Sequence, residues 1–264
     1  MCEIKTIVTT AGRPDNESRQ LAAIASQALH ASFVERRKRS VKKIAEIEHA
    51  NVVVAGKNRF EYYPFGAEEA FFFHPSSAAF RLKRVARGEH DPLLDAVNLQ
   101  EGNSLLDCTL GIGSDSMLAA FAVGKSGKVV GCEGNPNVAF IVSEGMKRYD
   151  ISQLPLLKCM ERITVIPSLA IDYLKQQPDH SFDVVYMDPM FEETIEESIN
   201  FIPLRNAGLH DSLSEEWIAE AKRVAKNRVV LKAHFKSPLF ERYHFKRDIR
   251  LNAKFHYGII EIGK

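Results

Sequence analysis

The chain has 264 residues, of which 45% are hydrophobic and 26% are charged, a composition typical of a folded globular protein. Its 35 Lys and Arg residues nearly balance 34 Asp and Glu residues, so the net charge of +1 excludes a globally basic coat protein for nucleic acid and leaves room for a local basic patch. We expect neither a membrane-spanning run, which needs about 20 apolar residues, nor a secretory leader. Four cysteines without CxxC spacing predict reduced thiols in a cytoplasmic protein that holds no metal.

The first 90 residues alternate short apolar runs with basic and polar segments. Apolar residues at helical spacing predict helices, and β-branched or aromatic runs that end at glycine or proline predict short strands. In chain order we expect a strand at 4–10, a helix at 17–29, a helix that passes into a strand over 44–56, two aromatic strands closed by Pro64 and Pro75, and a basic helix at 76–88. This pattern predicts a small N-terminal α/β domain over residues 1–90.

From residue 91 to residue 264 the pattern changes to apolar β-runs that alternate with amphipathic helices. Such alternation is typical of a parallel sheet covered by helices on both faces. The β-runs lie at 104–110, 128–134, 162–168, 182–188 and 228–233, and the tail at 242–263 can supply one or two closing strands. The predicted fold class is therefore α/β, with a Rossmann-like domain over residues 91–264 following the small N-terminal domain.

A glycine-rich turn, DCTLGIGSD, joins the first of these β-runs to a helix. Gly111 and Gly113 let the backbone approach a ligand closely, because neither carries a Cβ atom, although a tight turn without a ligand has the same pattern. The third glycine of the dinucleotide fingerprint is replaced by Ser116. Asp115 at the helix start would repel a pyrophosphate. The turn therefore favours a cationic ligand such as S-adenosylmethionine, with Asp107 and Asp115 as electrostatic partners; Asp115 as a helix cap is the alternative.

Polar residues also end the next two β-runs. Glu133 stands where this architecture places a carboxylate on the two hydroxyls of a ribose, or else it caps the helix that begins near Pro136. Pro167 and Ser168 suit a contact with the adenine end of a cofactor or with a substrate amine, although a serine there is equally a helix N-cap. With the glycine turn, these residues favour a nucleoside ligand.

The segment FDVVYMDPMF predicts a buried strand that ends in Asp188, at the edge where ligands bind in parallel sheets. We assign Asp188 and Phe191 as the catalytic residues. Asp188 can accept the hydrogens of an exocyclic amine and stabilise positive charge that develops on its nitrogen, and Phe191 can stack on the base. A strand that ends in a turn, with Phe191 in the core, is the structural alternative.

Taken in this order, the turn at 107–115, Glu133, Ser168 and the DPMF segment resemble a class I S-adenosylmethionine-dependent methyltransferase, and more narrowly the RsmJ-type family. That family consists of bacterial enzymes that act on guanine N2 in small-subunit ribosomal RNA. The similarity runs from Leu105 to the end and includes RVVLK at 228–232. It implies S-adenosyl-L-methionine as the cofactor. The implied contacts are Ser114, Asp115, Glu133, Gly134, Pro167, Ser168 and Asp188.

The resemblance implies methyl transfer to an exocyclic base amine, most naturally guanine N2 of small-subunit rRNA. Ser114 stands where the family usually has an arginine, and Gly134 rather than arginine follows the acid of the second strand. The segment after Phe191 also begins acidic, whereas the family often has a basic loop there. These departures leave the cofactor site intact and the RNA target open.

Two basic clusters support an RNA partner, because rows of cations can track phosphates, although a solvated helix face gives the same pattern. They comprise Arg36, Arg37, Lys38, Arg39, Lys42 and Lys43, and then Arg81, Lys83, Arg84 and Arg87. Two other functions compete with the methyltransferase. One is an NAD-dependent oxidoreductase, supported by the glycine turn and Glu133 alone, and the other is a noncatalytic RNA-binding or ribosome-assembly factor.

Overall fold

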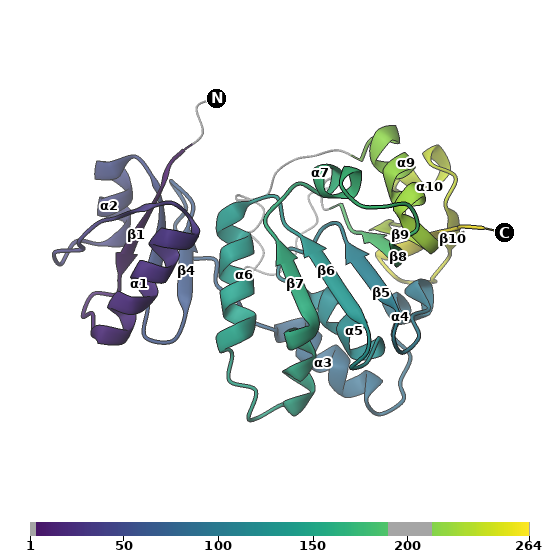
Figure 1. The fold of residues 1–264 in the computed structure, drawn as a ribbon, viewed down its shortest axis with the longest axis horizontal. Helices are drawn as coiled ribbons and strands as arrows, with labels where there is room; N and C mark the ends of the chain where they lie inside the picture. Colours follow the sequence, from purple (N-terminus) through teal and green to yellow (C-terminus); the bar gives the residue numbers. More distant parts are fainter. Residues whose placement is uncertain (1–3, 190–212, 264) are drawn as a thin grey trace. The chain divides into compact units, whose positions relative to one another are not determined.

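The structure is a computed structural model that describes residues 4–189 and 213–263, and it divides the chain into two compact units (Figure 1). Among the described residues, the first unit contains 4–74 and 135–150, and the second contains 75–134, 151–189 and 213–263. The change of composition near residue 90 falls inside the second unit. The basic helix that precedes this change belongs to the second unit as well.

In the part of the chain that the structure describes, the first unit has a four-stranded sheet and three helices. Its elements are β1 (Thr6–Thr10), α1 (Asn16–Ala28), β2 (Ser32–Phe33), α2 (Val41–Glu48), β3 (Asn51–Ala55), β4 (Phe60–Tyr63) and α6 (Pro136–Arg148). The strand order is β2-β1-β3-β4, in which β1 is parallel to β2 and β3 and β4 is antiparallel to β3. The second aromatic strand that we predicted is reduced to a single bridge between Phe71 and Tyr62.

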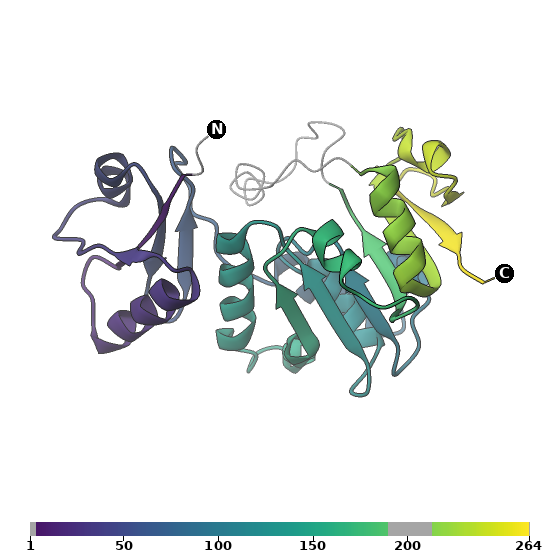
Figure 2. The same ribbon diagram turned by 45° about the horizontal axis from the view of Figure 1, so that its top comes forward.

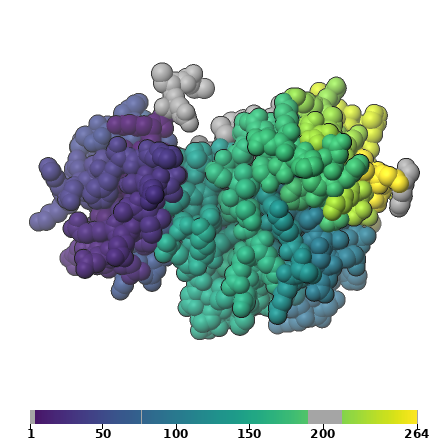
Figure 3. Space-filling model, viewed as in Figure 1, coloured from purple at the N-terminus to yellow at the C-terminus, as the bar shows by residue number. Residues whose placement is uncertain are grey.

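Local sequence explains where the helices of this unit begin. Asp15 caps α1 by accepting the Ser18 N–H at 2.8 Å, and Ser40 caps α2 by accepting the Lys43 N–H at 3.1 Å. Ile44 of α2 packs with the buried Ile7 and Val52 of the sheet. In the space-filling view the purple atoms of this unit form one continuous body, so the gaps between its ribbons are filled by side chains (Figure 3).

The second unit contains the predicted parallel sheet. Its elements are α3 (Ser76–Val85), α4 (Pro92–Val97), β5 (Ser104–Asp107), α5 (Ser114–Ala122), β6 (Lys128–Cys132), a 3₁₀ helix η1 (Pro155–Arg162), β7 (Ile163–Ile166), α7 (Ala170–Lys175), β8 (Phe182–Met187), α9 (Glu215–Val224), β9 (Ala225–His234), α10 (Leu239–Arg242), β10 (Lys246–Asp248) and β11 (Phe255–Glu261). The tail supplies both closing strands, β10 and β11. The predicted α/β fold is confirmed.

The strand order β10-β11-β9-β8-β5-β6-β7 places a switch point at β5. Strands β5 to β9 are mutually parallel, and β11 pairs antiparallel with β9 and β10. The chain first runs from β5 to one side through β6 and β7, and then continues on the other side of β5 with β8 and β9. In open parallel sheets a ligand binds at the carboxyl ends of the strands beside such a switch point.

Both faces of this sheet are covered, which explains why its strands read as continuous apolar runs. On one face, α9 packs on β8 and β9 and also contacts α7 (Figure 2). Leu174 of α7, Trp217 of α9 and Phe240 of α10 belong to one hydrophobic core with residues of these strands. The helices α3 and α4 each pack on α5, which also packs on β6. Within 4–189 and 213–263, no helix is long and apolar enough to cross a membrane.

Gly131 of β6 lies where the loop after β5 packs down on the sheet. A Cβ atom added at Gly131 would come within 2.5 Å of Leu110 Cδ1. We expect Gly131→Ala to lower the free energy of unfolding by about 1–3 kcal/mol, because the loop must shift to admit the methyl group. Urea unfolding followed by circular dichroism measures it. Gly12→Ala is the control, because a Cβ at Gly12 meets no atom within 4 Å; equal losses in both variants would contradict the packing argument.

Candidate active site

The glycine turn opens at the carboxyl end of β5 and leads into α5. Gly111 and Gly113 have φ angles of 51° and 80°, in the left-handed region that favours glycine. The Leu110 N–H donates to the Cys132 carbonyl at 2.9 Å and so fixes the turn to the end of β6. The backbone of the turn is therefore held rigidly beside the switch point.

Asp107 is the buried acid beneath this turn. Its carboxylate accepts the Thr109 N–H at 3.0 Å and the Ser116 hydroxyl at 2.6 Å, and only 1% of the residue is exposed. Burial raises the pKa of Asp107 to about 7, although the Ser116 and Thr109 hydrogen bonds oppose that rise. Its neighbours show that Asp107 braces the turn from within.

Asp115, in the first turn of α5, is the centre of a network of charged and polar side chains. Its carboxylate accepts the Arg81 guanidinium at 2.5 Å, the Tyr186 hydroxyl at 2.7 Å and the Lys232 ammonium at 3.2 Å. Burial by itself would raise the pKa of Asp115, but Lys232 and Arg81 outweigh that effect and hold this pKa well below its usual range. Two cations therefore neutralise a carboxylate that we expected to face the ligand.

Lys232 joins this network to Asp188 at the end of β8. Its ammonium lies 2.5 Å from Asp188 Oδ2, and the Asp188 N–H donates to the Thr109 hydroxyl at 2.7 Å. Burial acts to lower the pKa of Lys232, yet the carboxylates of Asp115 and Asp188 outweigh it and raise this pKa well above its usual range. Lys232 is thus a cation held between two carboxylates. We call Arg81, Asp115, Tyr186, Asp188 and Lys232 the edge network.

Arg81 corrects one of our expectations. We assigned it to a basic cluster for phosphates, but its guanidinium binds both carboxylate oxygens of Asp91 at 2.8 Å and also binds Asp115. Arg84 of the same cluster pairs with Glu89 at 2.7 Å. The periodicity of α3 turns Arg81 inward, so this arginine is part of the internal network.

The remaining predicted contacts also lie at the carboxyl edge of the sheet. The Glu133 N–H donates to the Ile166 carbonyl at 3.0 Å, and this bond joins the ends of β6 and β7. Ser168, the second residue after β7, donates its hydroxyl to the Leu169 carbonyl at 3.0 Å, and Pro167 beside it is exposed. Ser114 accepts the Ser77 hydroxyl at 3.2 Å, and Gly134 follows Glu133 at the half-buried end of β6. Phe191 lies outside the described residues.

Three network residues were absent from our sequence-based site. Lys232 ends the apolar RVVLK run, and the β8–β9 register places it level with Asp188. Tyr186 follows two valines in β8 and lies two residues before Asp188. In both cases a polar residue at the carboxyl end of a buried parallel strand was the available signal. Arg81 gave no such signal, because its cluster looked like a solvated helix face.

The side chains at this edge fit a cationic nucleoside. Asp115, Glu133 and Asp188 supply three carboxylates, whereas Lys232 and Arg81, which Asp91 also binds, supply two cations. S-adenosylmethionine carries a sulfonium and an ammonium group, which match this excess of acid. A pyrophosphate would add negative charge to this excess of acid and does not match. Among the described residues, no group of three or more His, Cys, Asp or Glu side chains is arranged to hold a metal ion.

The raised pKa of Asp107 predicts a pH dependence of stability. The folded protein keeps this proton up to about pH 7, whereas an unfolded chain releases it near its ordinary value of 3.8. The contribution is therefore complete below about pH 4 and is lost as the pH rises to about 7. We expect the stability of the wild type to fall relative to Asp107→Asn by about 1 kcal/mol per pH unit in that interval. Urea titrations followed by Trp217 fluorescence measure it, and a constant difference would contradict the assignment.

Comparisons with known proteins agree with this geometry. The SAM_MT family, described as "Putative SAM-dependent methyltransferase", matches residues 70–254. The chain is 42% identical to the uncharacterized protein YpiP of Bacillus subtilis, with 97% of this chain and 99% of that protein covered. It is also 36% identical to the ribosomal RNA small subunit methyltransferase J of Acinetobacter baylyi, over 43% of this chain and 41% of that enzyme.

A solved structure shows the same fold over nearly the whole chain. The SAM-dependent methyltransferase NGO1261 from Neisseria gonorrhoeae superposes with a TM-score of 0.60 at 17% identity, and 98% of this chain and 96% of that chain are covered. The family match selects S-adenosylmethionine over NAD as the cofactor. The chain belongs to the SAM_MT family of S-adenosylmethionine-dependent methyltransferases.

Proposed function

We propose that this methyltransferase acts on an exocyclic base amine in RNA, most naturally guanine N2 of small-subunit rRNA. The observation that carries the proposal is the position of Asp188, followed by Pro189, at the carboxyl end of β8 beside the switch point. A carboxylate there can accept the hydrogens of a flat amine and take up the proton that the nitrogen releases once it carries the methyl group. The partial similarity to ribosomal RNA small subunit methyltransferase J supports RNA as the substrate.

Residues at the ends of three neighbouring strands, β5, β6 and β7, would hold the cofactor. The turn at Gly111 and Gly113 would receive its methionine part, with Ser114 and Asp115 at the start of α5. Glu133, with Gly134, would accept the ribose hydroxyls, and Pro167 with Ser168 would contact the adenine. When bound, S-adenosylmethionine supplies an electrophilic methyl group. The acidic edge favours its positive charge over the neutral sulfur of the product, which aids product release.

The proposed role of Asp188 is to orient the amine so that its nitrogen attacks the methyl carbon in line with the bond to sulfur. Its carboxylate accepts an amine hydrogen, directs the nitrogen lone pair and stabilises the positive charge that develops on that nitrogen. Lys232 acts as a positioning residue, because its ammonium fixes Asp188 Oδ2 at 2.5 Å. Thr109 fixes the backbone of Asp188 from the other side, through the 2.7 Å hydrogen bond to its N–H.

A basic turn in the first unit supports contact with RNA phosphates. The Arg39 N–H donates to the Arg36 carbonyl at 2.9 Å, and Arg37 and Lys38 between them have φ angles of 44° and 63°. Such angles in non-glycine residues are strained by about 1 kcal/mol or more each. The Nε atoms of Arg36 and Arg39 each donate to the other residue's carbonyl, at 3.0 and 3.2 Å. Two arginines thus hold a turn that displays the exposed Arg37 and Lys38.

Transfer of a labelled methyl group tests the proposal. S-adenosylmethionine labelled on its methyl group is offered separately to small ribosomal subunits, deproteinised rRNA, tRNA and bulk protein from cells that lack this protein. We expect label in an RNA pool, released on digestion as N2-methylguanosine. Label in another base would support RNA as the substrate and show that the methylated atom is not guanine N2. Label in protein alone, or no label despite measured cofactor binding, overturns the proposal, and the second result favours a noncatalytic role.

A further inference from the structure

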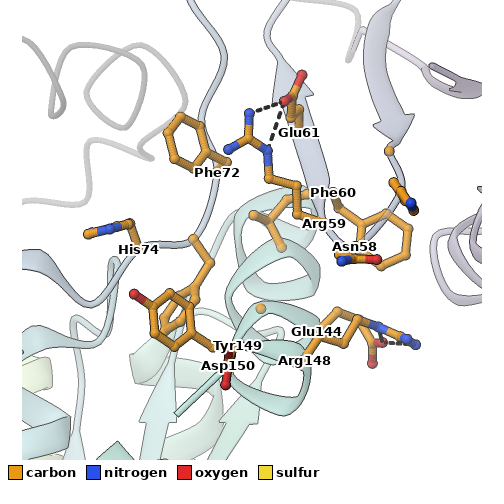
Figure 4. A pocket seen from close by; sticks show the side chains of 15 residues that line it. Asn58, Arg59, Phe60, Glu61, Phe72, His74, Glu144, Arg148, Tyr149 and Asp150 are labelled. Carbon is orange, nitrogen blue, oxygen red and sulfur yellow. Dashed lines mark hydrogen bonds and ion pairs between the residues drawn. The ribbon is translucent and has the colours of Figure 1, made fainter. Parts of the chain in front are cut away.

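The first unit contains a cavity that the reaction described above does not use. It has a volume of about 460 Å³ and lies between the β3–β4 hairpin, the segment at 72–74 and the C-terminal part of α6 (Figure 4). Every residue that lines it belongs to the first unit. Its size falls within the range of about 300–1,000 Å³ that is usual for small-ligand sites.

One wall of the cavity is a guanidinium stacked on an aromatic ring. The Arg59 guanidinium carbon lies 4.4 Å from the centre of the Phe72 ring, and Glu61 Oε1 accepts Arg59 Nε at 3.0 Å and Nη2 at 2.6 Å (Figure 4). The Arg59 side chain is 59% exposed, although an ion pair and a ring hold it in place. This wall is a fixed planar surface that carries both donors and acceptors.

The opposite wall consists of aromatic rings at the end of α6. The Tyr149 ring is perpendicular to that of Phe73, with 6.0 Å between centres, and to that of His74, with 5.9 Å. Gly145 permits this packing, because a Cβ atom there would lie 2.2 Å from Phe73 Cβ. Because Gly145 has no side chain, Phe73 can lie on the surface of α6 and form part of the cavity.

The charges around the cavity cancel. Its basic residues are Lys57, Arg59 and Arg148, and its acidic residues are Glu61, Glu144 and Asp150. Glu144 accepts Arg148 Nε at 3.1 Å, which repeats on α6 the pairing of Arg59 with Glu61. A phosphate gains little from a balanced site. An uncharged flat ring with polar edges gains both stacking surfaces and hydrogen-bonding partners.

We propose that this cavity binds one unstacked base of a single-stranded RNA segment, apart from the base that is methylated. The inference rests on the proposed function, since it takes RNA as the substrate. Stacking on aromatic rings and arginine planes is the usual means by which proteins hold bases in single-stranded RNA. The site would increase the affinity for unpaired RNA by stacking on a base and not by binding phosphates. Phosphate binding is the role proposed for the turn at Arg37 and Lys38.

The test measures binding of a short unstructured RNA that carries fluorescein and one 4-thiouridine. Phe72→Leu keeps the apolar bulk and removes the ring, so we expect the dissociation constant to rise about tenfold. The dependence of binding on salt should stay unchanged, because no phosphate contact is lost. Phe80→Leu is the matched control, since Phe80 is 71% exposed on α3 and lies outside the cavity. Urea unfolding followed by circular dichroism checks that both variants are folded.

The outcomes separate this proposal from the proposed function. A selective loss in Phe72→Leu, with 4-thiouridine crosslinks mapped to Phe72, His74 or Tyr149, supports the base site. Equal affinities of the two variants, or crosslinks only elsewhere, overturn it. If the wild type transfers methyl groups to RNA but does not bind this probe, the base site fails and the function stands. If it methylates no RNA, the proposed function fails and the base site fails with it. Should Phe72→Leu not fold, the crosslinks of the wild type decide.

Discussion

Replacing Asp188 with alanine should lower the rate of methyl transfer by at least about 100-fold while changing cofactor affinity far less. In the proposed reaction the carboxylate acts on the amine, and its interaction strengthens as positive charge develops on the nitrogen. Such an interaction contributes to turnover more than to binding of the ground state. Asp188→Asn keeps one acceptor oxygen and loses the charge, so its rate should fall between those of the wild type and Asp188→Ala.

Single-turnover rates and titration with S-adenosylhomocysteine measure the two quantities. Asp183→Ala is the control on the same strand. Asp183 lies near the start of β8, where it accepts the Ser104 N–H at 2.7 Å and pairs with Lys226 at 3.4 Å. Its loss should reduce stability and leave the transfer rate unchanged. An unaltered rate in Asp188→Ala, with the cofactor bound, would remove Asp188 from the chemistry.

Replacing Lys232 with methionine should have the largest effect on stability. The substitution keeps the length of the side chain but leaves the mostly buried carboxylates of Asp115 and Asp188 without the cation between them. Removing one member of a buried ionic group typically costs about 3–5 kcal/mol, because the remaining charge has lost both its partner and its water. Turnover should fall as well, since Asp188 loses the contact that fixes it.

Lys226→Met is the matched control, because Lys226 lies on the same strand and its side chain is 44% exposed. Its pairing with Asp183 should be worth less than about 1 kcal/mol. Urea unfolding compares the two variants, and Lys232→Arg, which retains the charge, should recover part of both stability and turnover. Equal losses in Lys232→Met and Lys226→Met would show that the edge network is solvated.

Local signals in the sequence predicted the strands and the glycine turn well. Strands β5, β6, β7 and β8 lie within predicted apolar runs, because strands buried on both faces need apolar residues at nearly every position. Strand β9 contains the predicted run at 228–233 and extends beyond it at both ends. Gly111 and Gly113 have positive φ angles, as expected for glycines in the tight turn that the sequence predicted. Short elements were missed. Helix α4 has 6 residues and η1 is a 3₁₀ helix, so neither extends far enough to give a clear periodicity.

The sequence could not show which charged side chains pair with one another. Arg81 and Asp115 are separated by 34 residues, and Asp188 and Lys232 by 44. Only the strand order and the direction of each helix bring these side chains together. The sequence of a basic helix does not reveal whether one of its arginine side chains points toward the core or toward solvent. For this reason Arg81 was assigned to RNA, although the carboxylates of Asp91 and Asp115 hold it within the fold.

The contacts of Arg81 bear on how the sequence can change over evolutionary time. One guanidinium satisfies Asp91, which also caps α4 through the Leu93 N–H, and Asp115, which adjoins the glycine turn. A substitution at Arg81 removes the cation that pairs with Asp91, and a substitution at Asp91 or Asp115 removes one of the two carboxylates that hold the partly buried guanidinium. Neutral drift through such an intermediate is costly, so related chains should replace these three residues together or keep all of them. The cofactor site therefore constrains a residue of α3 that need never touch the cofactor.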